Sequence, residues 1–361
     1  MSTTHDVLVI GGGQAGLAAG YELKRARRDF VILEASDTVG SAWRTRWDSL
    51  RLFTPAEHSS LPGLRFPAPN GYCPTGPEVA DYLESYATRH DLPVHTGVRV
   101  LRLARIGTGF EAITTRGTYV ARSVIVATGP FQAPKRPAFA SSLAPDVVQL
   151  HSHDYRRPAD VGAGSVVVVG SGNSAVQIAA ELAESGRDTT LCIGGRASVL
   201  PLRWMGRSIF DTLEAVGYMK VRADSRVGRF LKARQVIIGE SPRAASSRTG
   251  LKLAPRAVGA SASFIVAGDG SQLPARTVVW ATGYACDYSW IDAPVLDDAG
   301  RPEHERGFTR VPGLMFLGQT WLHTRGSALL GWVGRDARWL VERMQADRRT
   351  LSRVAFALGM L

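Results

Sequence analysis

A short apolar run, a glycine-rich turn and an amphipathic segment follow one another twice in this chain of 361 residues. The first copy, HDVLVIGGGQAGLAAG, contains Gly11, Gly13 and Gly16. The second copy, SVVVVGSGNSAVQIAAELA, contains Gly170, Gly172 and Ala175. Each copy predicts a buried parallel strand, a tight turn and a helix. Because such small residues permit the turn, the approach of a pyrophosphate and the packing of helix on strand, the sequence predicts two nucleotide-binding units.

The two copies differ at the position that selects the nucleotide. Glu34 stands 23 residues after Gly11, where a carboxylate accepts hydrogen bonds from a ribose diol. The residue 23 after Gly170 is Ile193, and Arg196 follows it closely. A missing carboxylate beside an arginine favours a ribose with a 2′-phosphate, which arginine can bind through two parallel hydrogen bonds. The alternatives are a solvated Arg196 and phosphate contacts from Arg203 or Arg207.

Composition and charge exclude several other classes of protein. Hydrophobic residues make up 45% of the chain and charged residues 21%, as in ordinary globular domains. No run approaches the ~20 apolar residues of a membrane helix, and the N-terminus resembles no signal segment. We therefore expect a cytoplasmic protein with no membrane contact. The net charge of +11 comes mostly from scattered arginines, without a basic helix or an RNA-binding signature, so we expect no nucleic-acid partner.

The cysteines and histidines carry no sign of a dithiol or a metal site. Cys73, Cys192 and Cys286 form no C-x-x-C pair, so the sequence offers no redox-active dithiol. The eight histidines show no metal-ligand spacing. We therefore expect no metal and no electron transfer through paired cysteines.

The order of segments is also repeated. Each glycine-rich unit is followed by an alternating β-meander that ends in the same three letters, first as Ala127, Thr128 and Gly129, then as Ala281, Thr282 and Gly283. The sequence predicts an α/β fold with two Rossmann-type dinucleotide-binding domains, each carrying a β-meander insertion. We expect residues 1–155 and 285–361 to form one discontinuous domain and residues 156–284 to form the other.

Together these motifs resemble the class B flavin-dependent monooxygenases, specifically short bacterial CzcO-like flavoproteins related to the flavin-containing monooxygenases. The resemblance covers nearly the whole chain and rests on GGGQAG with Glu34, GSAWRTRWDSLRLFTP, both ATG ends, LHSHDYR, GSGNSA and SALLGWVGRDA. It implies FAD in the first domain and NAD(P)H in the second, with NADPH preferred over NADH by the strand-end argument. It further implies O2-dependent oxygenation of a small organic substrate through a flavin peroxide, by S- or N-oxygenation or a Baeyer–Villiger reaction.

The chain departs from the family's pattern at two places. In the fingerprint F-x-G-x-x-x-H, His151 is present with Ser152 and Tyr155, but Pro145 and Val147 replace the Phe and the Gly. The flavin-facing Asn of animal-type members is absent from the segment LFTP after the tryptophans. These departures argue against the strict animal-type enzymes and leave the bacterial relatives open.

The resemblance also implies a set of site residues. Asn173 is expected between nicotinamide and flavin, with Ser152 as a neutral donor and His151 as either a catalytic or a structural residue. Trp43 and Trp47 are expected to shield the flavin from water, as are Trp321 and Trp332 unless they pack in the core. The predicted cofactor contacts are Gly11, Gly13, Gln14, Ala15, Gly16, Glu34, Ala35, Trp43, Arg44, Trp47, Val100, Ala127, Thr128, Gly129, Gly170, Gly172, Asn173, Ser174, Ala175, Gln177, Arg196, Ala281, Thr282, Gly283, Gln319 and Leu329.

Another function stays open at this point. The chain is also compatible with an NAD(P)H-dependent FAD oxidoreductase that passes electrons to a protein or a quinone without inserting oxygen. A flavin-binding sensor without turnover ranks last, because it leaves two complete nucleotide sites without a purpose. The missing dithiol and the segment GSAWRTRWDSLRLFTP favour the monooxygenase. The sequence identifies neither the substrate nor the oligomeric state, and it leaves a homodimer open.

Overall fold

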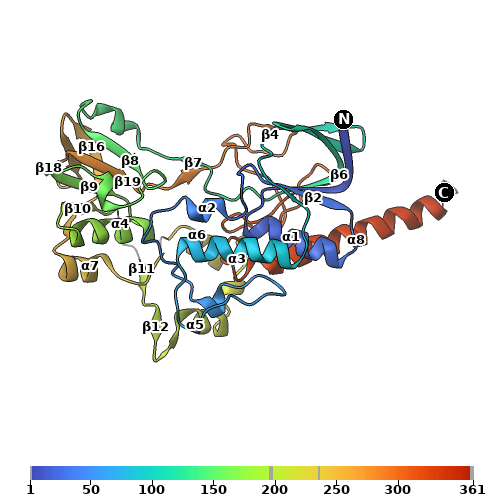
Figure 1. Cartoon of the computed structure of the whole chain (residues 1–361), viewed down its shortest axis with the longest axis horizontal. Helices are drawn as coiled ribbons and strands as arrows, with labels where there is room; N and C mark the ends of the chain where they lie inside the picture. Colours follow the sequence, from blue (N-terminus) through green and yellow to red (C-terminus); the bar gives the residue numbers. More distant parts are fainter. Residues whose placement is uncertain (1, 195–197, 235, 358–361) are drawn as a thin grey trace.

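The structure, a computed structural model, describes residues 2–194, 198–234 and 236–357, with side chains described within residues 4–346. Arg196, the predicted phosphate contact, lies outside the described residues. The described chain forms two lobes, each built on a sheet with parallel strands at its centre (Figure 1). Within the described ranges, no helix is both long and apolar enough to span a bilayer.

The first lobe is built on an eight-stranded sheet. Its strands are β1 (Ser2–Ile10), β2 (Phe30–Leu33), β3 (Val94–His95), β4 (Val100–Ile106), β5 (Gly109–Thr114), β6 (Gly117–Val126), β21 (Ile291–Asp292) and β22 (Leu314–Phe316). They lie in the order β21-β4-β5-β6-β1-β2-β3, and β22 also pairs with β6. Strands β1, β2, β3, β6 and β22 pair in parallel, while β4, β5 and β6 form the antiparallel meander.

Both faces of the parallel part of this sheet are buried. The helices are α1 (Gln14–Arg25), α2 (Ser41–Arg44), α3 (Gly76–Arg89) and α8 (Val333–Ala357). Val7 and Val9 of β1 pack into the same core as the apolar sides of α1, α3 and α8, while Leu8 and Ile10 pack into the core on the other face. Successive side chains of a strand point to opposite faces, so a strand that is buried on both faces must be apolar throughout.

The second lobe repeats this plan with a five-stranded parallel sheet. Its strands are β8 (Val148–His151), β9 (Ser165–Val169), β10 (Asp188–Cys192), β15 (Lys252–Ala254) and β19 (Thr277–Trp280), in the order β15-β10-β9-β19-β8. One core includes residues of α4 (Asn173–Glu184) and α7 (Pro242–Thr249). The core on the other face includes the antiparallel meander β16 (Ala257–Ser261), β17 (Phe264–Ala267) and β18 (Gln272–Pro274). The predicted fold class is confirmed.

The chain crosses between the lobes at a short pair of strands. β7 (Ala133–Pro134) pairs antiparallel with β20 (Tyr284–Ala285). Since β8 pairs with β19, Val148–His151 lies in the second sheet, although the predicted boundary had put it in the first domain. We therefore propose that both domain boundaries lie at the β7–β20 pair. The first boundary then precedes β8, and the second stays at residues 284–285, where the sequence prediction put it.

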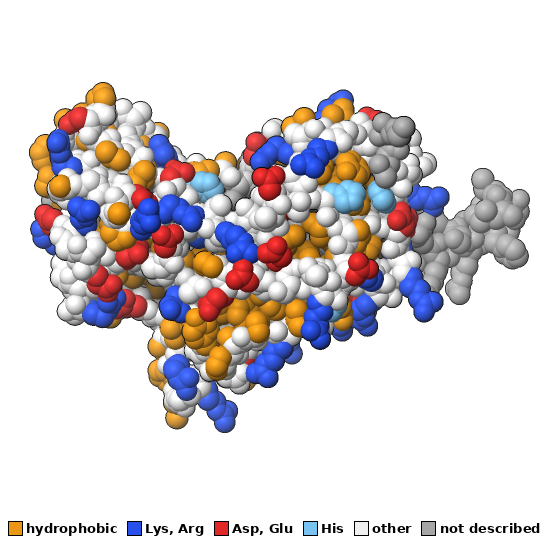
Figure 2. All heavy atoms as spheres, in the orientation of Figure 1, with side chains coloured by type: hydrophobic (Ala, Val, Ile, Leu, Met, Phe, Trp, Pro, Cys, Tyr) orange, Lys and Arg blue, Asp and Glu red, His pale blue; other side chains and the backbone are white. Residues whose placement is uncertain are grey.

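A further segment of the second half packs against the first lobe. It contains β11 (Ser198–Leu200), β12 (Arg203–Trp204), β13 (Arg207–Ser208), α5 (Ile209–Ala215), α6 (Arg226–Lys232) and β14 (Val236–Ile238). Its buried core includes Phe210 together with Trp332 from the C-terminal part of the chain. Figure 2 shows apolar surface around α5 and the β12–β13 hairpin, where Trp204 is 56% exposed. Short 3-10 turns complete the described structure, at Ala56–His58, Ala138–Ser142, Pro158–Asp160 and Tyr218–Lys220.

Candidate functional site

Two glycines of the first turn are required by the fold itself. Gly11 has a φ of +110°, and a Cβ added there would lie 2.6 Å from the carbonyl oxygen of Ala127. A Cβ on Gly16 would overlap the carbonyl oxygen of Gly11. The N–H of Gly11 also donates to the carbonyl of Leu33 at 2.8 Å. Because of these close contacts, glycine is needed at both positions for β1, β2 and the end of β6 to pack around the start of α1, whether or not a ligand is bound.

Gly13 has no such structural reason to be glycine. Its φ of −77° and ψ of −173° are extended values that any residue adopts, and a Cβ added there meets no atom within 4 Å. No side chain caps α1, so its first N–H groups lack a side-chain acceptor from the N-cap residue. Open space before an uncapped helix N-terminus fits the pyrophosphate of a dinucleotide. The residues present therefore fit the FAD site expected from the sequence.

Glu34 is fixed at the end of β2 and directed at the same turn. Its Oε2 accepts the N–H of Gly12 at 2.7 Å, and its Oε1 accepts the N–H of Ser36 at 2.8 Å. Each carboxylate oxygen retains a further lone pair for a ribose hydroxyl. The geometry therefore suits the role predicted for Glu34, and the residue after it, Ala35, is exposed.

The C-terminal part of the chain returns to this turn. The amide Nε2 of Gln14 donates to the carbonyl of Ala328 at 3.3 Å, and a Cβ on Gly318 would overlap that of Ala15. Three other predicted contact residues, Thr128, Gly129 and Gln319, form hydrogen bonds with neighbouring side chains. Gln132 donates to the Thr128 hydroxyl at 2.9 Å and to the Gly129 carbonyl at 2.8 Å, while Gln319 donates to the Tyr288 hydroxyl at 3.1 Å. The partly buried Val100 and Leu329 pack against two of the hydrophobic cores.

The tryptophan-rich segment lies between the lobes. Trp43 is half-buried and contacts cores of both lobes, and Trp47 is buried in the core of the second lobe. The Trp47 indole N–H is buried and has no acceptor among the described residues. A buried donor without a partner is costly, so a bound group that accepts its hydrogen bond would be favoured.

Arg44 is engaged elsewhere than predicted. Its guanidinium pairs with Asp81 at 2.7 Å and Glu84 at 2.9 Å, both on α3. The hydrogen bond to Asp81 raises the pKa of Arg44 above its ordinary value. In this structure Arg44 therefore fastens α2 to α3, and a cofactor contact from it stays a prediction.

The second turn reproduces the first with other residues. A Cβ on Gly170 would overlap the carbonyl oxygen of Ala281, as one on Gly11 would approach that of Ala127. The N–H of Gly170 donates to the Cys192 carbonyl at 3.1 Å, and Ala175 packs 3.0 Å from the same added Cβ. Gly172 is the extended N-cap of α4, which again has no side-chain cap. Ser174 follows in the first turn of α4.

Two predicted residues of α4 hold neighbouring backbone. The Asn173 side chain accepts the N–H of Ile238 at 3.2 Å and donates to its carbonyl at 2.5 Å. Gln177 donates to the carbonyl of Arg51 at 3.2 Å. In this structure the amide of Asn173 fastens β14 to the second turn, so its placement between nicotinamide and flavin stays a prediction.

His151 is fully buried at the end of β8. Its Nδ1 accepts the N–H of His153 at 3.1 Å, so the proton lies on Nε2, which donates to the Gly283 carbonyl at 3.0 Å. Burial lowers the pKa of His151 from its ordinary value of 6.5. The neutral ring thus has both nitrogens occupied, which favours the structural interpretation. Ser152 is also buried and donates its backbone N–H to Trp280, and the Thr282 hydroxyl donates to Lys135.

This burial predicts a dependence of stability on pH. Because its pKa is lower in the folded protein, His151 binds a proton more readily after unfolding. Stability should therefore fall as the pH drops below about 6.5, by at most ~1.4 kcal/mol per pH unit from this one group. In His151→Gln, whose amide does not titrate, the difference in urea midpoint between pH 7 and pH 5 should be smaller than in the parent. An equal difference in both proteins would contradict the prediction.

The structure adds a contact between the lobes that the sequence did not predict. The guanidinium of Arg46 donates to the Tyr284 hydroxyl at 2.5 Å and lies 5.3 Å from the centre of its ring. Tyr284 also stacks edge-on against His151, with ring centres 5.0 Å apart. The only sequence signal was that Tyr284 directly follows the second Ala-Thr-Gly end. This contact joins the tryptophan-rich segment to β20.

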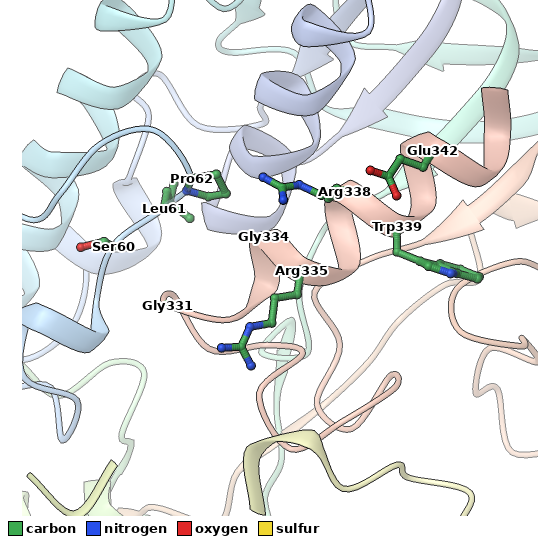
Figure 3. A pocket seen from close by; sticks show the side chains of 9 residues that line it. All are labelled: Ser60, Leu61, Pro62, Gly331, Gly334, Arg335, Arg338, Trp339 and Glu342. Atoms are coloured by element: carbon green, nitrogen blue, oxygen red, sulfur yellow. The ribbon is translucent and has the colours of Figure 1, made fainter. Parts of the chain in front are cut away.

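A surface cavity of about 410 Å³ lies beside the start of α8, away from the predicted residues. Figure 3 shows the segment Ser60–Pro62 facing the first turns of α8, with Arg338 extending toward Pro62 and Arg335 pointing away from that segment. Both arginines have carboxylate partners, Glu214 at 2.7 Å and Glu22 at 3.5 Å. No predicted site residue lines this cavity. Among the described residues, no group of three His, Cys, Asp or Glu side chains is placed to hold a metal ion.

Comparison with known proteins places these features in context. A family model described as pyridine nucleotide-disulphide oxidoreductase matches residues 8–238. The chain is 46% identical over 339 residues to an uncharacterized CzcO-like oxidoreductase of Geobacillus kaustophilus, covering 93% of this chain and 97% of that protein.

Solved structures show the same architecture. A flavin-containing monooxygenase from Stenotrophomonas maltophilia superposes with a TM-score of 0.80 at 32% identity, covering 95% of this chain and 99% of that one. A bacillithiol disulfide reductase from Staphylococcus aureus superposes with a TM-score of 0.70 at 18% identity, covering 96% and 99%. At that identity the second likeness concerns the fold alone.

Proposed function

The chain belongs to the pyridine nucleotide-disulphide oxidoreductase family, and from this premise we propose that it is an NADPH- and O2-dependent flavin monooxygenase acting on a small organic substrate. It is an FAD-dependent oxidoreductase related to the flavin-containing monooxygenases, which confirms the resemblance drawn from its motifs. The observation that carries the proposal is the likeness to the Stenotrophomonas flavin-containing monooxygenase, which extends over nearly the whole of both chains.

The residues of the two turns would hold the cofactors. The open space at Gly13 receives the pyrophosphate of FAD at the start of α1, and Glu34 accepts hydrogen bonds from its ribose. The second turn offers NADPH the equivalent place at the start of α4. Bound FAD would supply hydride acceptance from NADPH and the reduction of O2, the chemistry by which one oxygen atom can enter a substrate while the other leaves as water.

The protein's own part is to position the cofactors and to exclude water. Trp43 contacts cores of both lobes and Trp47 lies in the core of the second lobe, and there they would help to exclude water from a bound flavin. The buried N–H of Trp47 has no acceptor among the described residues. The Arg46–Tyr284 contact holds the tryptophan-rich segment against the second lobe. Asn173 and Ser152 carry no charge, and we keep both in the proposal as neutral hydrogen-bond donors near the second turn.

The thiols argue against electron transfer to a dithiol within this chain. Burial raises the pKa of Cys192 to about 12, and burial also raises the pKa of Cys73 and of Cys286. A cysteine must be a thiolate to act as a nucleophile, so these cysteines are poorly suited to thiol exchange at neutral pH. Oxygen insertion is therefore favoured over a relay through cysteines, in line with the missing C-x-x-C pair.

The test of the reaction class measures where the oxygen atoms of O2 go, into an oxygenated product or into H2O2. Purified protein is supplied with NADPH, and consumption of NADPH and O2 and release of H2O2 are measured with sulfides, amines and ketones. We expect at least one class to suppress H2O2 release and to give a product heavier by one oxygen atom. NADPH consumption that appears entirely as H2O2, or as reduced quinone without an oxygenated product, would support the electron-transfer alternative.

A further inference from the structure

The strand that ends the second nucleotide unit lies against an arginine whose role the sequence motifs leave open. Gly194 follows Ile193 just beyond β10. A Cβ added to Gly194 would lie 3.4 Å from both Cγ and Cδ of Arg256. The aliphatic stem of Arg256 therefore lies near Gly194, and Arg256 is exposed just beyond the end of β15, at the carboxyl edge of the sheet.

The backbone around Arg256 is held by two neighbours. The N–H of Ile193 donates to the carbonyl of Ala254 at 3.1 Å, which continues the pairing of β10 with β15. The carbonyl of Arg256 accepts the N–H of Gly268 at 2.8 Å, next to the turn between β17 and β18. Gly194 is itself fixed to the glycine turn, because its N–H donates to the Ser171 hydroxyl at 2.7 Å. Arg256 is thus placed beside the turn at which the nucleotide binds.

The two units of this chain can be aligned through equivalent hydrogen bonds. Gly11 donates to Leu33 in the first unit and Gly170 donates to Cys192 in the second, so Glu34 corresponds to Ile193. The backbone N–H of Glu34 donates to the carbonyl of His95 on the neighbouring strand, just as the N–H of Ile193 donates to the carbonyl of Ala254. Two residues further along, Gly97 corresponds to Arg256.

The second unit has therefore exchanged an acid for an apolar residue and a glycine for an arginine at the same sheet edge. Among the described residues, no carboxylate forms an ion pair with Arg256. On the adjacent turn, Asp269 accepts hydrogen bonds from the N–H and hydroxyl of Ser271 at 3.0 and 2.6 Å. The edge where a ribose lies thus presents a guanidinium without a carboxylate partner.

We propose that Arg256 binds the 2′-phosphate of NADPH and is the residue that favours NADPH over NADH. The inference rests on the proposed use of NADPH and adds a residue for its recognition. A guanidinium matches a phosphate with two parallel charge-assisted hydrogen bonds, and it offers NADH nothing equivalent.

The test measures binding without turnover. Isothermal titration gives the Kd of 2′,5′-ADP and of 5′-AMP for the FAD-loaded protein, for Arg256→Gln and for Arg256→Lys. The glutamine keeps the stem near Gly194 and removes the charge. We expect Arg256→Gln to weaken 2′,5′-ADP about ten- to a hundredfold with little change for 5′-AMP, and Arg256→Lys to lose less. The matched control is Arg276→Gln, whose arginine pairs with Asp146 at 3.2 Å just before β19 and should leave both Kd values unchanged.

Each other outcome overturns the proposal. Equal weakening of both ligands would mean that Arg256 supports the adenosine pocket and does not read the phosphate. If Arg256→Gln still prefers 2′,5′-ADP over 5′-AMP as strongly as the parent does, another arginine, such as Arg196, binds the phosphate. A parent protein that binds the two ligands equally would show that no 2′-phosphate is read. Because no oxygenated product is measured, these results are independent of whether the proposed monooxygenase reaction occurs.

Discussion

Gly13→Val should give a folded protein that purifies without FAD. The valine adopts the extended backbone of Gly13, and its Cβ meets no protein atom within 4 Å, so the fold has room for it. The same side chain fills the space before α1 that the pyrophosphate needs. Any steric cost above ~1.4 kcal/mol weakens FAD binding by more than tenfold. The measurement is the ratio of flavin to protein absorbance, with circular dichroism to confirm the fold.

The matched control is Gly162→Val. Gly162 also has nothing within 4 Å of an added Cβ, but it lies in the loop before β9 and away from both turns. This variant should be folded and as yellow as the parent. A folded Gly13→Val protein with full flavin content would place FAD elsewhere. Loss of structure in Gly13→Val alone would instead show that the glycine serves the fold, as Gly11 and Gly16 do.

Trp332→Ala should destabilise the folded protein strongly. The side chain is buried, stacks on His58 with ring centres 5.6 Å apart, and packs on Phe210 at 5.5 Å. Its indole N–H donates to Glu214 at 2.7 Å. Removing such a side chain costs about 3–5 kcal/mol, because a cavity forms and the carboxylate loses its donor. The free energy of unfolding, from denaturant titration, checks this value.

Trp204→Ala provides the comparison. Trp204 is more than half exposed on the β12–β13 hairpin of the same segment, so its loss should change stability by no more than ~0.5 kcal/mol. Similar losses in the two variants would contradict the assignment of Trp332 to the core between this segment and the first lobe. The sequence had left Trp332 between the flavin wall and core packing, and its burial in that core favours the second.

The two Rossmann-type units were predictable because their requirements are local. Gly11 and Gly16 are needed where β1 meets α1, and the few residues of a strand–turn–helix fix that contact whatever the rest of the chain does. The position of Glu34 at the end of β2 follows from the same spacing. Repetition of the pattern then predicted the second sheet.

The site itself depended on contacts between residues distant in the chain. The amide of Asn173 is bound to Ile238, 65 positions away, and the ring of His151 to Gly283, 132 positions away, so neither side chain has the freedom that its motif suggested. The domain boundary that we propose before β8 rests on the pairing of β8 with β19, a partner that the sequence of β8 does not specify.

The strand, the glycine turn and the carboxylate at the strand end were therefore determined by the sequence alone, since backbone geometry over a few residues dictates them. Which arginine lies beside the second glycine turn was decided only by the tertiary structure. Arg256 reaches Gly194 because β15 pairs with β10, although the two residues are far apart in the chain. Spacing along a sequence records local geometry, whereas proximity across a sheet edge exists only once the sheet has formed.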